Sequence, residues 1–121
     1  MMSSVEVEVA KIAESLLLKT DHARPINVTT LSGGRNNSVH LLNTSTRQYV
    51  LKRLFHSKDD LRDSFLAETC FYAHCESMRI ESVPKLFVAA REYRSLLLEF
   101  VEGYELNAQD VSDKFIQSAL S

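Results

Sequence analysis

The stretch YVLKRLF, residues 49–55, decides the fold of this chain. Two sets of side chains alternate along it: Tyr49, Leu51 and Arg53 on one side, and Val50, Lys52 and Leu54 on the other. This period of two predicts a β-strand over residues 48–55. Lys52 stands in its apolar part, where an unpaired ammonium is costly to bury. Lys52 therefore needs an anionic partner, which is either a carboxylate of the chain or a phosphate of a bound ligand.

The other predicted elements flank this strand. They are a helix over 3–20, strands over 26–31 and 39–42, a helix from Asp59 or Asp60 to about Ser77, strands over 85–90 and 95–100, and a last helix from Asn107 or Asp110 to Leu120. This order predicts an α+β fold. We expect a five-stranded, mostly antiparallel sheet, with a helix between the third and fourth strands and another helix before the first strand.

Both long helices show an apolar side. In the first, the spacing of three and four predicts one buried face, formed by Val5, Val9, Ile12 and Leu16. In the second, Leu61, Phe65, Thr69 and Tyr72 mark one side, and Leu66, Cys70 and Ala73 lie near another. We therefore expect both helices to pack on the sheet.

Composition excludes several classes of protein. The chain has 121 residues, 45% of them hydrophobic and 25% charged, as expected for one small domain or one lobe of a larger one. A net charge of −2 argues against nucleic acid or a membrane surface as a partner. No apolar run approaches the roughly 20 residues of a membrane span. Without a secretion signal, Cys70 and Cys75 are expected to be reduced thiols in a cytoplasmic protein.

Gly33 and Gly34 lie between two predicted strands, in LSGGRNNSVH, residues 31–40. Backbone N–H groups of such a turn can approach phosphate oxygens without a Cβ in the way. The pattern is neither a Walker A loop nor a dinucleotide fingerprint, because a strand rather than a helix follows. Taken alone, the two glycines favour a simple hairpin.

Glu68 changes the weight of these observations. It lies sixteen residues after Lys52 (68 − 52), on the helix that follows the strand. A strand lysine held by a glutamate of the next helix presents its ammonium to the α and β phosphates of ATP in protein-kinase-like folds. The alternative is an edge-strand lysine whose ammonium reaches water. Together with the glycines, the pair favours a nucleotide site.

The segment SLLLEFVEG, residues 95–103, offers a further element of such a site. Leu96 to Leu98 form a buried strand, and the chain then leaves the sheet toward Gly103. Free backbone groups at the end of a sheet can bind the edge of an adenine ring.

Five segments in this order resemble one known family. LSGGRNNSVHLL, YVLKR, FLAET, VPKLF and LLLEFVEG resemble the N-terminal lobe of the aminoglycoside phosphotransferase and choline kinase-like family, over residues 28–106. These are small-molecule kinases with a protein-kinase-like fold. The loop departs from the protein-kinase pattern, because Arg35, Asn36, Asn37 and Ser38 follow Gly34.

The resemblance implies a set of ATP-binding residues. It assigns Ser32, Gly33, Gly34 and Asn37 to the phosphate loop, Lys52 to the phosphates with Glu68 as its partner, Val50 and Leu98 to the adenine pocket, and the Glu99 carbonyl and Val101 amide to the adenine edge. ATP is the implied ligand. Magnesium is expected only with the C-terminal lobe.

The family's catalytic segments are missing from the sequence. Its H-x-D-x-x-x-x-N and D-x-D or D-F-G-like segments belong to the C-terminal lobe, and only 18 residues follow Gly103 (121 − 103). We therefore expect no catalytic residue and no metal ligand here. Residues 1–102 form the predicted nucleotide-binding lobe, and residues 103–121 form the exit from the hinge and a first helix of the next lobe. Cys70, His74 and Cys75 lack the second pair of ligands that a structural zinc site requires.

Two interpretations stay open. The first is the nucleotide-binding lobe of a kinase that transfers the γ-phosphoryl group of ATP to a substrate hydroxyl, inactive without its other lobe. The second is a stand-alone, non-catalytic module that binds nucleotide or protein. Expected partners are a nucleotide, and either a C-terminal lobe on a separate chain or a second copy bound through the uncovered lobe face.

Overall fold

A computed structural model describes residues 4–20, 27–33, 37–55 and 63–101, with side chains from Val7 onward. The elements are α1 (Ser4–Leu18), β1 (Asn27–Gly33), β2 (Asn37–Asn43), β3 (Gln48–Leu54), α2 (Ser64–Ser77), β4 (Leu86–Ala90), the 3₁₀ turn η1 (Arg91–Tyr93) and β5 (Ser95–Glu99). This order confirms the predicted α+β class. Residues 102–121, with the predicted last helix and the second predicted domain, lie outside the described residues.

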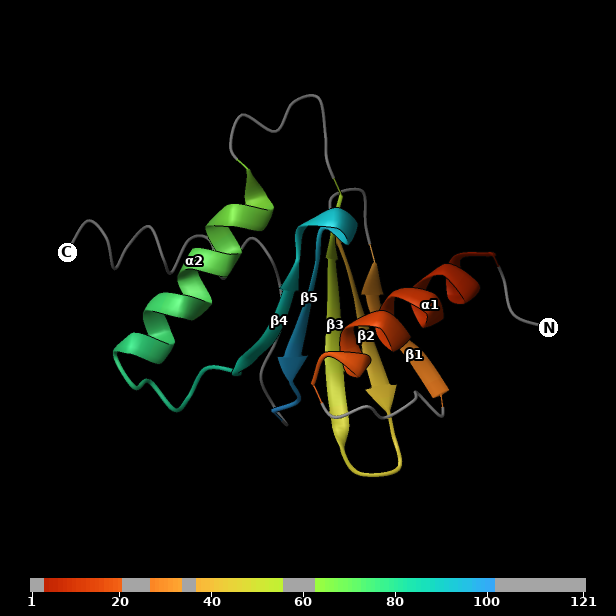
Figure 1. The fold of residues 1–121 in the computed structure, drawn as a ribbon, viewed down its shortest axis with the longest axis horizontal. Coiled ribbons are helices and arrows are strands. Elements are labelled where there is room, and N and C mark those ends of the chain that lie inside the picture. The colour runs from red at the N-terminus through yellow and green to blue at the C-terminus, as the bar shows by residue number, and fades with distance from the viewer. Residues whose placement is uncertain (1–3, 21–26, 34–36, 56–62, 102–121) are drawn as a thin grey trace.

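The five strands form one antiparallel sheet in the order β1-β2-β3-β5-β4 (Figure 1). β1 and β4 are therefore the edges, and β3 lies in the centre between β2 and β5. The helices lie on opposite faces of the sheet, which we call the α1 face and the α2 face.

The α1 face is an apolar core. Its buried residues are Val9, Ile12, Ala13, Leu16 and Leu17 of α1, with Leu42, Tyr49, Leu51, Ala90 and Leu97 of the sheet. The predicted apolar side of α1 is confirmed by Val9, Ile12 and Leu16, whereas the side chain of Val5 lies outside the described residues. Burial of this stripe explains why the segment docks as a helix on the sheet.

The α2 face has a second core. Val39, Val50, Leu54, Leu96 and Leu98 of the sheet pack with Phe65, Phe71, Tyr72 and Cys75 of α2. Adjacent residues of β3 thus alternate between the two cores, which is why nearly every residue of that strand is buried. Thr69 is only half-buried, and Phe71 and Cys75 extend the buried side of α2 beyond the predicted one.

The start of α2 corrects an expectation. Its N-cap is Asp63, not Asp59 or Asp60, because the Asp63 carboxylate accepts the N–H of Leu66 at 3.2 Å. A carboxylate in this position satisfies one of the helix's unpaired first-turn donors. The helix ends at Ser77 with Met78 as its C-cap, and Arg79 follows with a left-handed φ of 57°. The Ile80 N–H donates to the Cys75 carbonyl.

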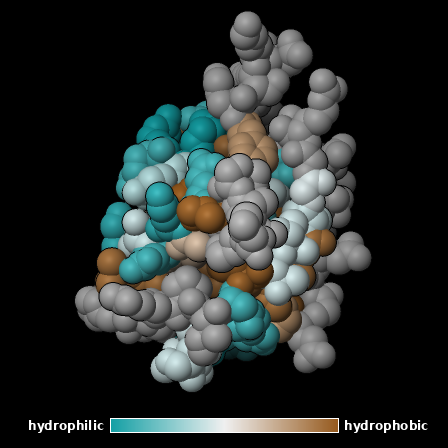
Figure 2. Space-filling view, turned by 90° about the vertical axis from the view of Figure 1, so that its right-hand side faces the viewer, coloured by the Kyte–Doolittle hydropathy of each residue, from teal (hydrophilic) through white to brown (hydrophobic). Residues whose placement is uncertain are grey.

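The surface beyond these cores is mixed. Figure 2 views the molecule from the right-hand side of Figure 1, the side on which β1 lies, and its hydrophobic residues form separate groups among hydrophilic ones. Among the described residues, no helix combines the length and the apolar character needed to cross a membrane. Cys70 is exposed, Cys75 is buried, and both are free thiols.

Candidate functional site

Lys52 lies at the centre of the α2 face. It occupies β3, opposite Val39 of β2 and Leu96 of β5, and its side chain is 0% exposed. Paired residues of an antiparallel sheet project to the same face. The ammonium is therefore surrounded by the apolar core under α2, where it requires an anionic partner.

Glu68 is that partner in the structure. Its Oε1 lies 2.5 Å from Nζ of Lys52, and the glutamate side chain is 1% exposed. The second oxygen, Oε2, is buried without a hydrogen-bond partner among the described residues. Burial raises the pKa of the Glu68 carboxyl, and the Lys52 ammonium opposes that rise. The pair joins the central strand to α2 through a charged hydrogen bond.

The pair is closed to solvent in this structure. A phosphate can reach Nζ only if the atoms now covering it move, because Lys52 has no exposed surface. The geometry thus shows a lysine and a glutamate held together. Their role toward a nucleotide stays a prediction.

A β-bulge brings Ser32 into register with Lys52. The pairing of β1 with β2 shifts between Thr30 and Ser32, so that Ser32 lies opposite Val39, which in turn lies opposite Lys52. Bulges re-aim side chains by one residue. Without the shift, Leu31 would take this place. Ser32 and Lys52 therefore belong to one row of residues across the α2 face.

Gly33 ends β1, opposite Ser38 of β2. A Cβ built on Gly33 meets no atom within 4 Å, so packing does not require glycine at this position. A glycine at position 33 leaves room for another molecule to approach the backbone closely. Gly34 lies outside the described residues. Asn37 lies opposite Leu54, and the register places it on the α2 face as well.

The predicted adenine-pocket residues lie side by side on the same face. Val50 of β3 is paired with Leu98 of β5, and both are buried in the α2-face core. Glu99 follows at the end of β5, where its N–H donates to the Lys85 carbonyl at 2.8 Å. Val101 lies two residues beyond the strand. Val50, Lys52 and Leu98 are thus brought together, and Glu99 and Val101 continue from Leu98.

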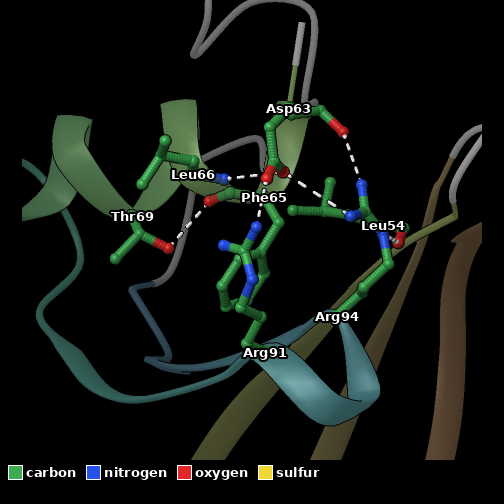
Figure 3. Close-up of polar contacts among 8 residues, drawn as sticks. Leu54, Asp63, Phe65, Leu66, Thr69, Arg91 and Arg94 are labelled. Carbon is green, nitrogen blue, oxygen red and sulfur yellow. Dashed lines mark hydrogen bonds and ion pairs between the residues drawn. The ribbon is translucent and has the colours of Figure 1, made fainter.

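Sequence reasoning missed a polar cluster at the start of α2, which Figure 3 shows. Asp63 bonds to Arg91 (2.8 Å) and lies 3.5 Å from Arg94, and Arg94 Nε also donates to the Leu54 carbonyl at 2.9 Å. Aspartate is a common helix cap, but nothing local distinguished Asp63 from Asp59 and Asp60, and nothing local indicated the arginines.

His40 is a second buried polar residue outside the predicted set. It lies in β2 between hydroxyls, with Nδ1 3.1 Å from Thr30 Oγ1 and Nε2 2.9 Å from Ser38 Oγ. Burial lowers its pKa, and the charge of Arg53 lowers it further. Within the described ranges, no three His, Cys, Asp or Glu side chains gather as a metal site would require.

Comparisons with known proteins bear on the fold. No protein-family model matches the sequence, and no curated protein matches it either. Five chains of solved structures match, among them the choline kinase LicA from Streptococcus pneumoniae. That similarity has a TM-score of 0.60 at 20% identity and covers 98% of this chain and 39% of that chain.

The fold of this chain is therefore kinase-like. At this low identity, similarity to a solved structure carries the fold and not the reaction. This chain spans about two fifths of the length of that choline kinase.

Proposed function

We propose that this chain is the nucleotide-binding lobe of an ATP-dependent small-molecule phosphotransferase. In the whole protein, the γ-phosphoryl group of ATP would be transferred to a substrate hydroxyl. The observation that carries this proposal is the buried pair of Lys52 and Glu68, which links β3 to α2 in a kinase-like fold. Lys52 would bind the α and β phosphates, and Glu68 would hold the ammonium in place.

The surrounding residues support the same role. Ser32 lies in the row of Lys52, and Gly33 has open space where a Cβ would stand. Val50 and Leu98 are buried apolar residues on the same face as the pair, and they would line an adenine pocket when the atoms that cover them move. ATP fits this set of residues because a phosphate group would compensate the lysine charge when the covering atoms move.

A purely structural ion pair is the competing role. Burying two charges costs desolvation that their attraction roughly repays, so an apolar pair is often as stable. Stability measurements alone therefore cannot separate the two roles, whereas nucleotide affinity can.

The test is a titration of the 121-residue chain with Mg-ATP by calorimetry. We expect Lys52→Met to weaken binding by about tenfold or more, because hydrogen bonds to charged groups contribute roughly 1.5–3 kcal/mol. Lys19→Ala is the matched control, since Lys19 is exposed and pairs only loosely with Glu92 at 3.7 Å. Binding by Lys52→Met as tight as that of the wild type would overturn the proposal.

A double replacement separates binding from folding. Lys52→Met together with Glu68→Leu removes both charges and leaves no buried ion unpaired. We expect this variant to unfold near the wild-type temperature and to have lost the phosphate-dependent part of ATP affinity.

Gly33→Ala probes the loop. The new methyl group meets no atom of the described residues, so the melting temperature should stay unchanged. Weaker ATP binding by this variant would support a phosphate contact at Gly33.

Phosphoryl transfer by the 121-residue chain alone is expected to be absent, and a radiolabelled transfer assay checks this. Turnover above background would contradict it and would place a catalytic group within these residues.

A further inference from the structure

We propose that Arg94 and Asp63 act as a clamp that positions α2 and thereby holds Glu68 in register with Lys52. This inference rests on the proposed function, because it assigns a positioning role for the same phosphate-binding pair. The clamp consists of Leu54, Asp63, Arg91 and Arg94, which Figure 3 labels, together with Ser64.

Arg94 connects three segments through one side chain. Its Nε donates to the Leu54 carbonyl at the end of β3, and its terminal nitrogens lie 3.5 Å from Asp63 Oδ1 and 3.4 Å from Ser64 Oγ at the start of α2. The backbone of Leu54 completes the connection, because its N–H donates to the Arg94 carbonyl at 2.8 Å. A planar guanidinium suits this arrangement, since its donors form a rigid fork.

The backbone of Arg94 is itself informative. Its φ and ψ are both 47°, in the left-handed region where glycine is preferred. An arginine there costs conformational free energy, and the contacts of its backbone and side chain with Leu54 and of its side chain with Ser64 are available to offset that cost. Such a residue at a site of contact between elements is a reason to look for function.

Asp63 is the second residue of the clamp. Its carboxylate caps α2 by accepting the Leu66 N–H and also accepts a hydrogen bond from Arg91 at 2.8 Å. The Leu66 N–H lowers the pKa of this carboxyl, and the hydrogen bond from Arg91 and the charges of Arg91 and Arg94 lower it further. Asp63 therefore stays charged across the neutral range and keeps both arginines as partners.

The clamp lies close to the pair along both elements. Leu54 is two residues after Lys52 in β3, and Asp63 is five residues before Glu68, about 7.5 Å along the helix axis. Fixing the end of β3 against the start of α2 thus restricts how far α2 can slide or rotate. A displacement of Glu68 that is small compared with the length of its hydrogen bond to Lys52 would already weaken that bond, because hydrogen-bond strength depends on distance and angle.

Arg94→Gly is the decisive variant. It removes the clamp side chain and at the same time eases the left-handed backbone, so the melting temperature should change little. The matched control is Arg79→Gly, since Arg79 is the other non-glycine residue with positive φ among the described residues and is exposed at the far end of α2. Asp63→Asn is a second test, because it keeps an N-cap and removes the charge.

The experiment compares Mg-ATP with adenosine as ligands of the 121-residue chain. A clamp that positions Glu68 affects only the phosphate-dependent part of binding. We expect Arg94→Gly and Asp63→Asn to raise the Kd for Mg-ATP by about fivefold to tenfold, at the lower end of typical coupling between sites. The Kd for adenosine should be unchanged, and Arg79→Gly should change neither constant.

A double-mutant cycle with Glu68→Gln completes the test. If Arg94 acts through Glu68, Arg94→Gly should lower Mg-ATP affinity less than twofold in the Glu68→Gln background. Additive effects, equal losses for adenosine and Mg-ATP, or an Arg94→Gly variant that binds Mg-ATP as the Arg79→Gly control does would each overturn the clamp. Unweakened Mg-ATP binding by Lys52→Met would instead reject the proposed function, and the clamp with it.

Discussion

The two faces of the sheet solve the same packing problem differently. The α1 face has an apolar core, and its ion pair between sheet and helix, Arg53 with Glu8, reaches solvent because the Glu8 side chain is 60% exposed. Its buried histidine, His40, lies between two hydroxyls, and burial lowers its pKa. The α2 face holds a lysine and a glutamate within a comparable apolar core. Apolar burial supplies most of the attachment of α1 to the sheet, because the Arg53–Glu8 pair is partly exposed and exposed pairs contribute little. The charged pair on the α2 face is therefore not needed for packing alone.

The largest expected loss of stability comes from a substitution on the α2 face. Lys52→Met alone leaves the Glu68 carboxylate buried without its partner, and we expect a loss of about 3–5 kcal/mol in the free energy of unfolding near neutral pH. The loss should shrink as the pH falls, because burial already raises the pKa of Glu68 and the protonated form is less costly to bury. Chemical denaturation at several pH values checks this. A loss independent of pH would contradict it.

A slightly smaller effect is expected on the α1 face. Leu97→Ala removes a fully buried side chain of β5 from the apolar core of the α1 face, and should cost about 2–5 kcal/mol. In contrast to Lys52→Met, its cost should vary little with pH. The same denaturation series measures both variants side by side.

The pH dependence of stability expected from His40 on the α1 face is opposite in sign to that expected from Glu68 on the α2 face. The pKa of His40 is lowered below 6.5 by burial and by Arg53, so the folded chain binds this proton less readily than the unfolded chain does. Stability contributed by neutral His40 is present above pH 6.5 and is lost as the pH falls toward the lowered pKa. We expect His40→Gln to flatten the stability profile in that window. A profile parallel to that of the wild type would show that other groups cause the loss.

The smallest expected effect lies outside both faces. Arg79→Gly places glycine at a φ of 57° after the end of α2 and should stabilise the chain by up to about 1 kcal/mol. A rise in melting temperature of a few degrees checks this. Destabilisation would mean that the Arg79 side chain contributes more than its backbone costs.

Much of the fold could be predicted from periodicity. The alternation along residues 48–55 predicted a strand with two different sides, which the structure has over 48–54. The spacing of Val9, Ile12 and Leu16 indicated the buried side of α1. The predicted start of α2, at Asp59 or Asp60, lies several residues before the observed cap at Asp63. Three aspartates near the helix start are chemically equivalent caps, and the bond to Leu66 distinguishes Asp63.

The candidate site divides in the same way. A lysine in an apolar strand required an anion, and the order of motifs pointed to Glu68, but the contact depends on where α2 lies on the sheet. The shift that brings Ser32 opposite Val39 had no local signal, because bulges arise from pairing between strands. The bonds of Arg94 to Leu54 and Asp63 join residues 40 and 31 positions apart (94 − 54, 94 − 63).

The sequence by itself determined the five strands, the first two helices, their order and the need for a partner at Lys52. Local patterns suffice for this, because side-chain periodicity and the cost of burying a charge act on single elements. Only the tertiary structure decided that Ser32, Glu68 and Leu98 lie on the face of Val50 and Lys52, and that Arg94 contacts the start of α2. Strand register and helix placement are set by contacts between distant residues, which no local pattern contains.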